Sequence, residues 1–513
     1  GRRGGGGGEA CARRIFAATI DARLVAHDAA TGKPCPGFGP GGVVDLRKGL
    51  RAPPDEFTFY QVTSPPAIVG DLVITGSAVA DNTNLAPASG EVRAFDARTG
   101  VLKWSFDPIP QDSTDPAFKT WANGVTALIG AANVWSVMVA DPERDLVFLP
   151  TSSPAPDYFG GMRLGENRYA NSIVALRAST GKVVWHFQSV HHDLWDFDNA
   201  APPVLVTVNK DGAKIPAVIQ TGKSGMLYVL DRTTGKPVFP IEERPVPRSS
   251  VPGEVASPTQ PFTSVIPPLV PLRYSAEDAW GPTPEAKAAC RTIVAGLRND
   301  GPFTPPSLQG IISQPGNIGG AHWGGVAIDE KHGLAIVPVN RVPAMVQLFV
   351  SHGFKIDSSK TADAARGITD FEYTNMRGTP YVMRRRLILG PPPAGLPCTP
   401  PPFGALVAVN LGTGAIAWDV PLGTMGGFPG SPNLGGPVVT AGGLVFIGAT
   451  LDRQLRAFDV ETGKELWSVP LPAGARATPM TYEAGGRQFV AIAAGGGGPF
   501  GAGDAIIAFA LPR

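Results

Sequence analysis

The sequence predicts an all-β fold, because its composition is rich in turn residues and a short pattern recurs along it. The 513 residues include 64 glycines and 53 prolines, a usage typical of many turns and few long helices. The pattern is an apolar run, an Asp or similar residue, a Thr-Gly pair, and an aromatic residue four positions after the Gly. Clear copies end at Trp104, Trp185 and Trp467, and weaker copies end at Phe239 and Trp418.

The physical interpretation of this pattern is a β-hairpin. A strand ends at the Asp, Thr-Gly supplies a turn in which Gly is free to take positive φ, and the aromatic residue opens the next strand. The copies recur after roughly 50 to 80 residues, about one propeller blade plus insertions. A four-stranded blade cannot bury both of its faces alone, so we expect the blades to stack radially as a β-propeller. The tryptophans of the pattern are expected to pack between blades.

Other elements follow from apolar runs bounded by turn residues. Strands are predicted within residues 67–76, 146–150, 325–329, 334–339, 443–449 and 488–494. One helix is predicted over about 284–299, with Thr283 as its N-cap and Gly301 as its C-terminal stop. It lies in a Pro-rich insertion at about 243–315, and a second insertion, first charged and then Pro-rich, covers about 352–402. Long insertions of this kind are usually lids, partner surfaces or mobile loops.

Charge and composition restrict the possible partners. The net charge is +1, from 44 basic and 43 acidic residues, which argues against nucleic acid as a partner. There is no run of about 18 or more apolar residues, so no membrane span is predicted, and no signal peptide is recognisable. Residues 1–10 are Gly-rich and predicted to be disordered, and a start without Met suggests a processed or truncated product. Four cysteines (Cys11, Cys35, Cys290 and Cys398) would allow one or two bridges in an oxidising compartment, with the pairing left open.

The strongest candidate for a functional site is the stretch from His191 to Asp198, which holds two imidazoles, three carboxylates and an indole in eight residues. Buried charges must be paired or bind a cation, so this density suits a site on a loop held by strands better than a core. A solvated loop is the alternative. Lys223 follows in Thr-Gly-Lys-Ser-Gly, just before the next strand. The ends of one blade's inner strands can therefore bring Lys223 and Asp196 to the same axial opening of the propeller. Trp135 lacks the Thr-Gly spacing and is therefore not a repeat tryptophan.

Several further segments matter beside residues 191–198. They are Thr63–Pro66, Phe303–Ser307, Trp323–Gly325, Leu434–Pro437 and Ala477–Tyr482. With these segments the chain resembles the membrane-bound quinoprotein dehydrogenases of the glucose, quinate and shikimate group, which use pyrroloquinoline quinone (PQQ). The resemblance extends over about residues 11–512.

This resemblance implies that residues 11–513 form a propeller of the eight-bladed kind, with PQQ and a divalent cation, Ca²⁺ or Mg²⁺, near its axis. Against the family pattern, the amino-terminal membrane helices and about the first blade and a half are absent. Asp196 then matches the catalytic base and a cation ligand, and Lys223 matches the lysine at the quinone carbonyls. Trp135 matches the tryptophan that stacks on the cofactor, and Asp81 and Asn82 match an Asp-Asn pair at the cation and cofactor site.

Further residues match the family more loosely. Ser153 lies near the position of a third cation ligand. His192 is expected to shape the surroundings of Asp196 at the cofactor, and Asn340 lies two residues beyond an asparagine position of the family. Asp193 and Asp198 are expected to be turn or cap residues.

The resulting hypothesis is a PQQ-dependent dehydrogenase that oxidises a hydroxyl of a sugar, cyclitol or other polyol and passes electrons to membrane ubiquinone. It would work at the periplasmic face of the inner membrane, attached through a segment absent from this chain. Gly497 stands where glucose-oxidising members have His, which argues against glucose. One alternative, a quinoprotein alcohol dehydrogenase, lacks support because there is no adjacent Cys-Cys pair and no Cys-x-x-Cys-His. The other alternative is a non-catalytic propeller scaffold with the same repeats, against which Asp196, Lys223 and Trp135 favour the enzyme.

Overall fold

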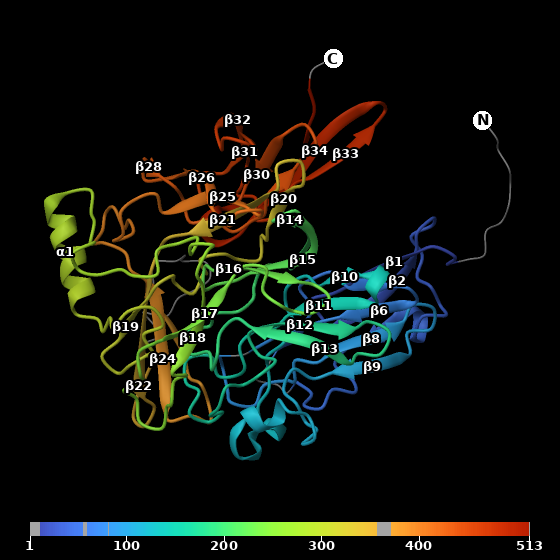
Figure 1. Ribbon diagram of the computed structural model, residues 1–513, viewed down its shortest axis with the longest axis horizontal. Helices are drawn as coiled ribbons and strands as arrows, with labels where there is room; N and C mark the ends of the chain where they lie inside the picture. Colours follow the sequence, from blue (N-terminus) through green and yellow to red (C-terminus); the bar gives the residue numbers. More distant parts are fainter. Residues whose placement is uncertain (1–10, 55–58, 81, 357–370, 512–513) are drawn as a thin grey trace.

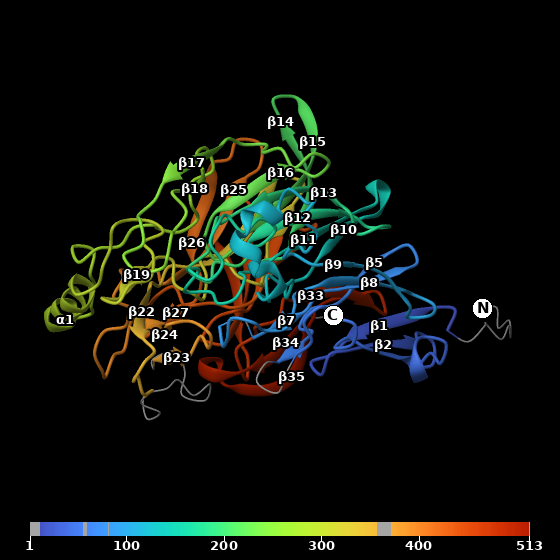
Figure 2. The same cartoon turned by 90° about the horizontal axis from the view of Figure 1, so that it is seen from below.

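The computed structural model describes residues 11–54, 59–80, 82–356 and 371–511, and these form a nearly all-β structure, as predicted. Among them, seven antiparallel sheets follow one another in chain order, and we number them blades 1 to 7. Figure 1 shows the blades succeeding one another around the molecule from the blue to the red end of the chain, and Figure 2 shows the same arrangement from below.

The first four blades contain the amino-terminal half of the strands. Blade 1 comprises β1 (Arg14–Ala18), β2 (Arg23–Asp28) and β3 (Val43–Asp45). Blade 2 comprises β5 (Ala67–Val69), β6 (Leu72–Thr75), β8 (Val92–Asp96) and β9 (Leu102–Phe106). Blade 3 comprises β10 (Val139–Asp141), β11 (Leu146–Pro150), β12 (Ser172–Arg177) and β13 (Val183–Gln188). Blade 4 comprises β14 (Val204–Lys210), β15 (Ala213–Thr221) and β16 (Leu227–Asp231).

The last three blades complete the series. Blade 5 comprises β20 (Ala327–Asp329), β21 (Leu334–Asn340), β25 (Gly404–Asn410) and β26 (Ile416–Pro421). Blade 6 comprises β29 (Val438–Val439), β30 (Leu444–Ile447), β31 (Gln454–Asp459) and β32 (Glu465–Pro470). Blade 7 comprises β33 (Met480–Ala484), β34 (Arg487–Gly496) and β35 (Ala502–Phe509). All six strand segments predicted from the sequence contain strands.

Smaller sheets and helices lie between the blade strands. Two-stranded sheets pair β4 (Tyr60–Gln61) with β7 (Ala78–Val79), β17 (Ile241–Pro245) with β18 (Thr259–Thr263), and β27 (Thr424–Met425) with β28 (Phe428–Pro429). A four-stranded sheet has the order β19 (Ile311–Ser313), β22 (Ala344–Val350), β24 (Tyr381–Leu387), β23 (Glu372–Thr374). Short 3-10 helices lie at Pro40–Gly42, Phe118–Thr120, Ala122–Ala127, Pro142–Arg144 and Gly498–Phe500.

The repeat tryptophans pack between neighbouring blades, as the hairpin pattern predicts. The Trp185 indole N–H donates to the Arg232 carbonyl of the next blade at 3.1 Å, and Trp104 and Trp418 make the equivalent bonds. The ring of Trp185 lies against Gly235, the glycine of the next Thr-Gly turn, where an added Cβ would come within 2.7 Å of it. Trp467 differs, because it contacts Phe509 of β35 but remains 40% exposed.

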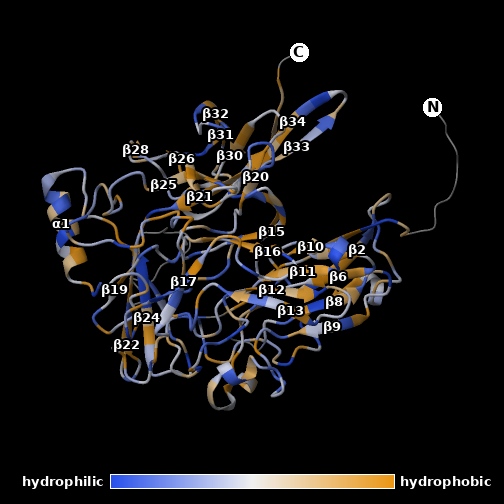
Figure 3. Ribbon diagram, in the orientation of Figure 1, coloured by the Kyte–Doolittle hydropathy of each residue, from blue (hydrophilic) through white to orange (hydrophobic). Residues whose placement is uncertain are grey.

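Apolar side chains fill the interfaces between successive blades. Blades 4 and 5, for example, share a buried cluster that includes Val208, Ile219, Val337 and Val407. Figure 3 shows β15 and β16 of blade 4 in hydrophobic colours. These interfaces supply the burial that a single blade cannot provide.

The first insertion contains the one α-helix of the described residues, α1 (Pro284–Ala295). Thr283 caps it as predicted, its side chain accepting a hydrogen bond from the Ala286 amide. The predicted end is wrong, because the helix stops at Ala295 and Gly296, rather than Gly301, is the C-cap residue. A glycine there weakens further propagation.

The second insertion is not a loop throughout. Of its residues, 357–370 lie outside the described part of the chain, whereas β23 and β24 extend a sheet with β22. Disulfides join Cys11 to Cys35 and Cys290 to Cys398, which settles the pairing that the sequence leaves open. The second bridge ties α1 to the end of this insertion. In the described residues, no helix is long and apolar enough to cross a membrane.

Candidate active site

The acidic stretch folds as a buried loop between β13 and β14. Asp193, Asp196 and Asp198 are all nearly inaccessible to solvent. The Asp193 carboxylate accepts hydrogen bonds from the amides of Trp195 and Phe197, so Asp193 is the turn residue that the sequence predicts. Asp196 has φ of +60°, a left-handed conformation that Asp tolerates better than most residues. The solvated-loop alternative is therefore wrong.

Lys223 reaches this loop from the turn that follows β15. Its Nζ lies 2.5 Å from Asp196 Oδ1 and 2.8 Å from Asp198 Oδ2. Burial would lower the Lys223 pKa, but the charges of the two carboxylates outweigh it and raise that pKa above its ordinary value. Lys223 is therefore a permanent cation at this site. The expectation that Asp198 is only a turn or cap residue is wrong, because Asp198 is a partner of this ammonium.

The second oxygen of Asp196 faces an arginine from the distant insertion. Arg385 Nη1 of β24 lies 2.8 Å from Asp196 Oδ2 and also donates to the Tyr158 hydroxyl, which lies 3.3 Å from the same oxygen. Glu372 of β23 holds the other side of the guanidinium, with contacts of 2.8 and 2.9 Å. Burial raises the pKa of Asp196 to about 6, against the lowering effect of Lys223. A carboxyl group with such a pKa can serve as a base near neutral pH.

Trp135 forms one wall of the same site. Its indole N–H donates to Asp198 Oδ2 at 3.3 Å, and Lys223 Nζ lies 5.9 Å from its ring centroid. The ring is only partly buried and meets Trp323 edge-on, with 6.0 Å between centroids. The structure thus brings together Asp196, Lys223 and Trp135, as the sequence predicts, and offers a planar ligand an aromatic surface beside a cation.

Of the four predicted cation ligands, Asp196, Ser153 and Asn82 lie in the described residues. The Ser153 amide donates to Asp198 Oδ1 at 2.9 Å, and its hydroxyl contacts both Asp193 and Asp198. Asn82 Oδ1 is buried without a hydrogen-bond partner among the described residues, while Asp81 lies outside those residues. No group of three or more His, Cys, Asp or Glu side chains in the described chain forms a ready metal site. An unpartnered buried amide oxygen is nevertheless a donor type that binds hard cations such as Ca²⁺.

Two other predicted residues support the site without touching Asp196. Asn340 bonds the Asn433 backbone through both ends of its amide, at 2.8 and 3.1 Å, and also reaches Gly319. The neighbouring Gly320 amide donates to the Lys223 carbonyl, so Asn340 steadies the segment behind Lys223. His192 is buried, and its two ring nitrogens contact the Gly165 carbonyl at 2.7 Å and Glu254 at 2.9 Å.

Sequence reasoning missed Arg385, Tyr158 and Glu372. Tyr158 and Arg385 lie far from Asp196 along the chain, and no local motif marks them. The available signal is the run of three arginines in β24, whose charges interrupt an otherwise apolar strand pattern. A charge inside a strand pattern needs a buried partner.

Taken together, these observations define a class of protein: a β-propeller with a buried polar site where loops of several blades and an insertion meet. Residues 2–490 match a PQQ family, the β-propeller domain of glucose, ethanol and alcohol dehydrogenases. The chain belongs to this family, which confirms the resemblance and the propeller fold inferred from the sequence.

Its relatives are named quinoprotein dehydrogenases. The chain is 39% identical to the quinoprotein glucose dehydrogenase of Escherichia coli (strain K12), over 98% of this chain and 64% of that protein. It is 38% identical to the quinate/shikimate dehydrogenase (quinone) of Acinetobacter baylyi, over 98% of this chain and 63% of that protein. It therefore spans slightly less than two thirds of the length of these relatives.

Solved structures agree with this assignment. The quinohemoprotein alcohol dehydrogenase from Comamonas testosteroni superposes with a TM-score of 0.67 at 25% identity, covering 97% of this chain and 65% of that one. A europium-containing methanol dehydrogenase superposes with a TM-score of 0.64 at 25% identity, covering 94% of this chain and 72% of that one.

Proposed function

We propose that this chain is the catalytic propeller of a PQQ- and cation-dependent dehydrogenase that oxidises a hydroxyl group of a sugar, cyclitol or other polyol. The observation that carries the proposal is the buried contact of Lys223 with Asp196 and Asp198 beside the Trp135 ring. A non-catalytic propeller scaffold would not be expected to keep such a cluster, because burying charged side chains costs free energy of desolvation.

The residues present fit the cofactor. Trp135 would support its plane, Lys223 would approach its carbonyl oxygens, and Asp196 with Asn82 and Asp81 would hold Ca²⁺ or Mg²⁺. When bound, PQQ supplies the electrophilic carbonyl that accepts the hydride from the substrate carbon.

Asp196 is the base in this mechanism. Its carboxylate accepts the proton of the substrate hydroxyl, and its pKa of about 6 leaves it ionised at neutral pH yet basic enough to be protonated in the transition state. Arg385 and Lys223 bind one oxygen each and fix the orientation of the carboxylate. The substrate hydroxyl must approach an oxygen that already accepts from one of these cations.

Lys223 stabilises negative charge. Because it stays protonated, it offers a fixed ammonium to the oxygen that becomes negative as hydride is transferred. Asp198 keeps this ammonium in place when Asp196 changes its protonation state. Burial of the whole cluster strengthens these interactions by excluding water.

Substrate and acceptor are inferred from the relatives. The quinate/shikimate relative carries a quinone acceptor in its name, so a membrane ubiquinone is the proposed acceptor here. Reaction at the periplasmic face, with attachment through a segment outside this chain, fits the same class. Gly497 favours a polyol other than glucose.

The test is dye reduction by the purified chain given PQQ and Ca²⁺ or Mg²⁺, with glucose, quinate, shikimate and glycerol as candidate substrates. Asp196→Asn should lower the rate by at least about a hundredfold, the ordinary contribution of general base catalysis. Asp211→Asn is the control, because that carboxylate is 84% exposed and pairs with Lys210 at the surface. An Asp196→Asn protein that melts like the parent chain and still reduces dye at the parental rate would remove Asp196 from the mechanism.

A further inference from the structure

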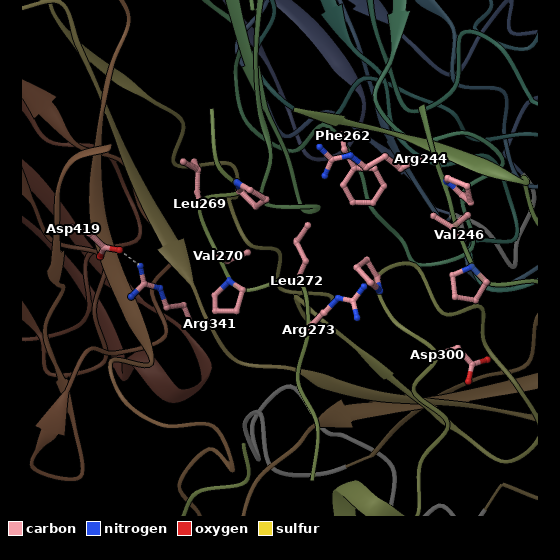
Figure 4. Close-up of a pocket in the computed structure, with 15 residues that line it drawn as sticks. Arg244, Val246, Phe262, Leu269, Val270, Leu272, Arg273, Asp300, Arg341 and Asp419 are labelled. Carbon is pink, nitrogen blue, oxygen red and sulfur yellow. Dashed lines mark hydrogen bonds and ion pairs between the residues drawn. The ribbon is translucent and has the colours of Figure 1, made fainter. Parts of the chain in front are cut away.

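A cavity lies outside the cluster described above (Figure 4). Its volume is about 820 Å³, within the range of about 300–1,000 Å³ that holds organic ligands in proteins. It is bordered by the β17–β18 hairpin, by the segment 268–273 and by the edge of blade 5. Five prolines line it together with Val246, Phe262, Leu269, Val270 and Leu272, so its walls are mainly apolar.

One positively charged side chain that lines this cavity has no ion-pair partner among the described residues. Arg273 makes no hydrogen bond or ion pair within the described residues, and Figure 4 shows it beside Leu272, facing the same space as Phe262. The other charged lining residues all have partners. These pairs are Arg341–Asp419, Arg244–Glu242 and Asp300–Arg298.

The inner wall of the cavity rests directly on the turn that carries Lys223. The Leu269 amide donates to the Gly225 carbonyl at 2.9 Å. The Val270 side chain occupies the space that a Cβ on Gly225 or Gly320 would need. Gly320 in turn donates its amide to the Lys223 carbonyl at 2.8 Å. A single layer of residues therefore separates the cavity from the Lys223 backbone.

We propose that this cavity binds the lipophilic benzoquinone that reoxidises the cofactor, an inference that rests on the proposed function. The ring and tail of such a quinone are apolar and match the proline, leucine and valine walls. Its carbonyl oxygen accepts a hydrogen bond from Arg273, which has no other partner in the described part of the chain. A multiply charged anion would instead call for more than one unpaired cation.

The position suits electron transfer across the Lys223 turn. Reoxidation would remove two electrons and two protons from the reduced cofactor and restore its quinone form. The bound benzoquinone takes up two electrons and two protons and leaves as the hydroquinone. No other reactant is required.

Binding can be tested without the cofactor. Ubiquinone-1, a short-chain and water-dispersible quinone, is titrated into the cofactor-free chain by calorimetry. Leu272→Trp should weaken binding by narrowing the cavity, and Arg273→Gln should weaken it about tenfold or more, the value of a charge-assisted hydrogen bond. Arg98→Gln is the matched control, because that guanidinium is 77% exposed and far along the chain on the blade 2 hairpin.

Activity provides a second readout that separates the two proposals. In the PQQ-loaded chain, Arg273→Gln should lower ubiquinone-1 reduction while reduction of phenazine methosulfate stays at the parental rate. Arg273 is exposed and unpaired, so this variant is expected to fold even if Leu272→Trp does not. The quinone site would be overturned if the parent chain does not bind ubiquinone-1, or if Arg273→Gln binds it as tightly as the parent chain does. It would also be overturned if Arg273→Gln lowers the rates of ubiquinone-1 and phenazine methosulfate reduction in parallel. Quinone binding without any dye reduction would instead contradict the dehydrogenase proposal and leave the cavity assignment standing.

Discussion

Replacing Arg385 by methionine tests whether the ion cluster holds the insertion sheet onto the acidic loop. The guanidinium is 13% exposed and lies between Asp196, whose side chain is 8% exposed, and Glu372, which is 45% exposed. Water can solvate Glu372 after the change, so most of the cost comes from Asp196. Removing one partner of a buried ion pair costs about 3–5 kcal/mol, and Lys223 still contacts Asp196, so we expect a loss near 3 kcal/mol.

The assay is urea unfolding at pH 7, followed by tryptophan fluorescence. Arg384→Met is the matched control on the same strand, because Arg384 bonds the neutral Gln347 and stacks on Phe349, and it should cost about 1 kcal/mol. In an Asp196→Asn background the loss caused by Arg385→Met should shrink by about 1 kcal/mol or more, since no buried charge is then left behind. Equal losses for the two arginine variants, or a loss that the background does not change, would refute the reasoning.

Two further predictions concern the frame around the site. Gly235→Ala should destabilise the chain, because this glycine has φ of +71° and an added Cβ would meet the Trp185 ring. Gly212→Ala is the control, because this glycine has φ of +79° but open space around it, so the change carries only the backbone strain. Equal urea midpoints for the two variants would contradict this prediction. Burial lowers the pKa of His322 to about 4, and its Nδ1 accepts from the Gly324 amide, so it is neutral in the folded state. Between pH 6.5 and 4 the unfolded chain therefore binds the extra proton at His322, so the His322 contribution to stability falls as pH falls, by up to about 3 kcal/mol. The raised pKa of Asp196 makes a contribution of the opposite sign in the same range, which is common to the parent chain and the His322 variant. His322→Gln should flatten that slope in urea unfolding measured across the range.

The features that could be predicted from the sequence are those that depend on short stretches of neighbouring residues. The Thr-Gly turns need only a short run of residues to form, so the hairpins and the tryptophans between blades could be predicted from them. Asp196 and Lys223 could be paired because both lie where blade strands end. The end of α1 was misplaced, because local signals leave a helix boundary uncertain by several residues and Gly296 stops the helix before Gly301.

The remainder depends on contacts between distant segments. Arg385 lies 189 residues from Asp196 and 227 from Tyr158, and these residues meet only after the insertion sheet has docked. No periodicity or spacing encodes such a meeting. The pairing of Cys290 with Cys398 is equally non-local, with a separation of 108 residues.

The charges at the site also bear on the cation. The buried part of the cluster is neutral when it is fully ionised, because Asp196 and Asp198 balance Lys223 and Arg385, whereas Glu372 is 45% exposed and its charge can be solvated by water. Burial nevertheless disfavours the charged form of Asp196, and the raised pKa of Asp196 is the shift that burial produces. In the proposed function, a divalent cation held by Asp196 would add positive charge to this neutral cluster. The same cation would then favour ionised Asp196, because a nearby positive charge lowers the pKa of a carboxyl group.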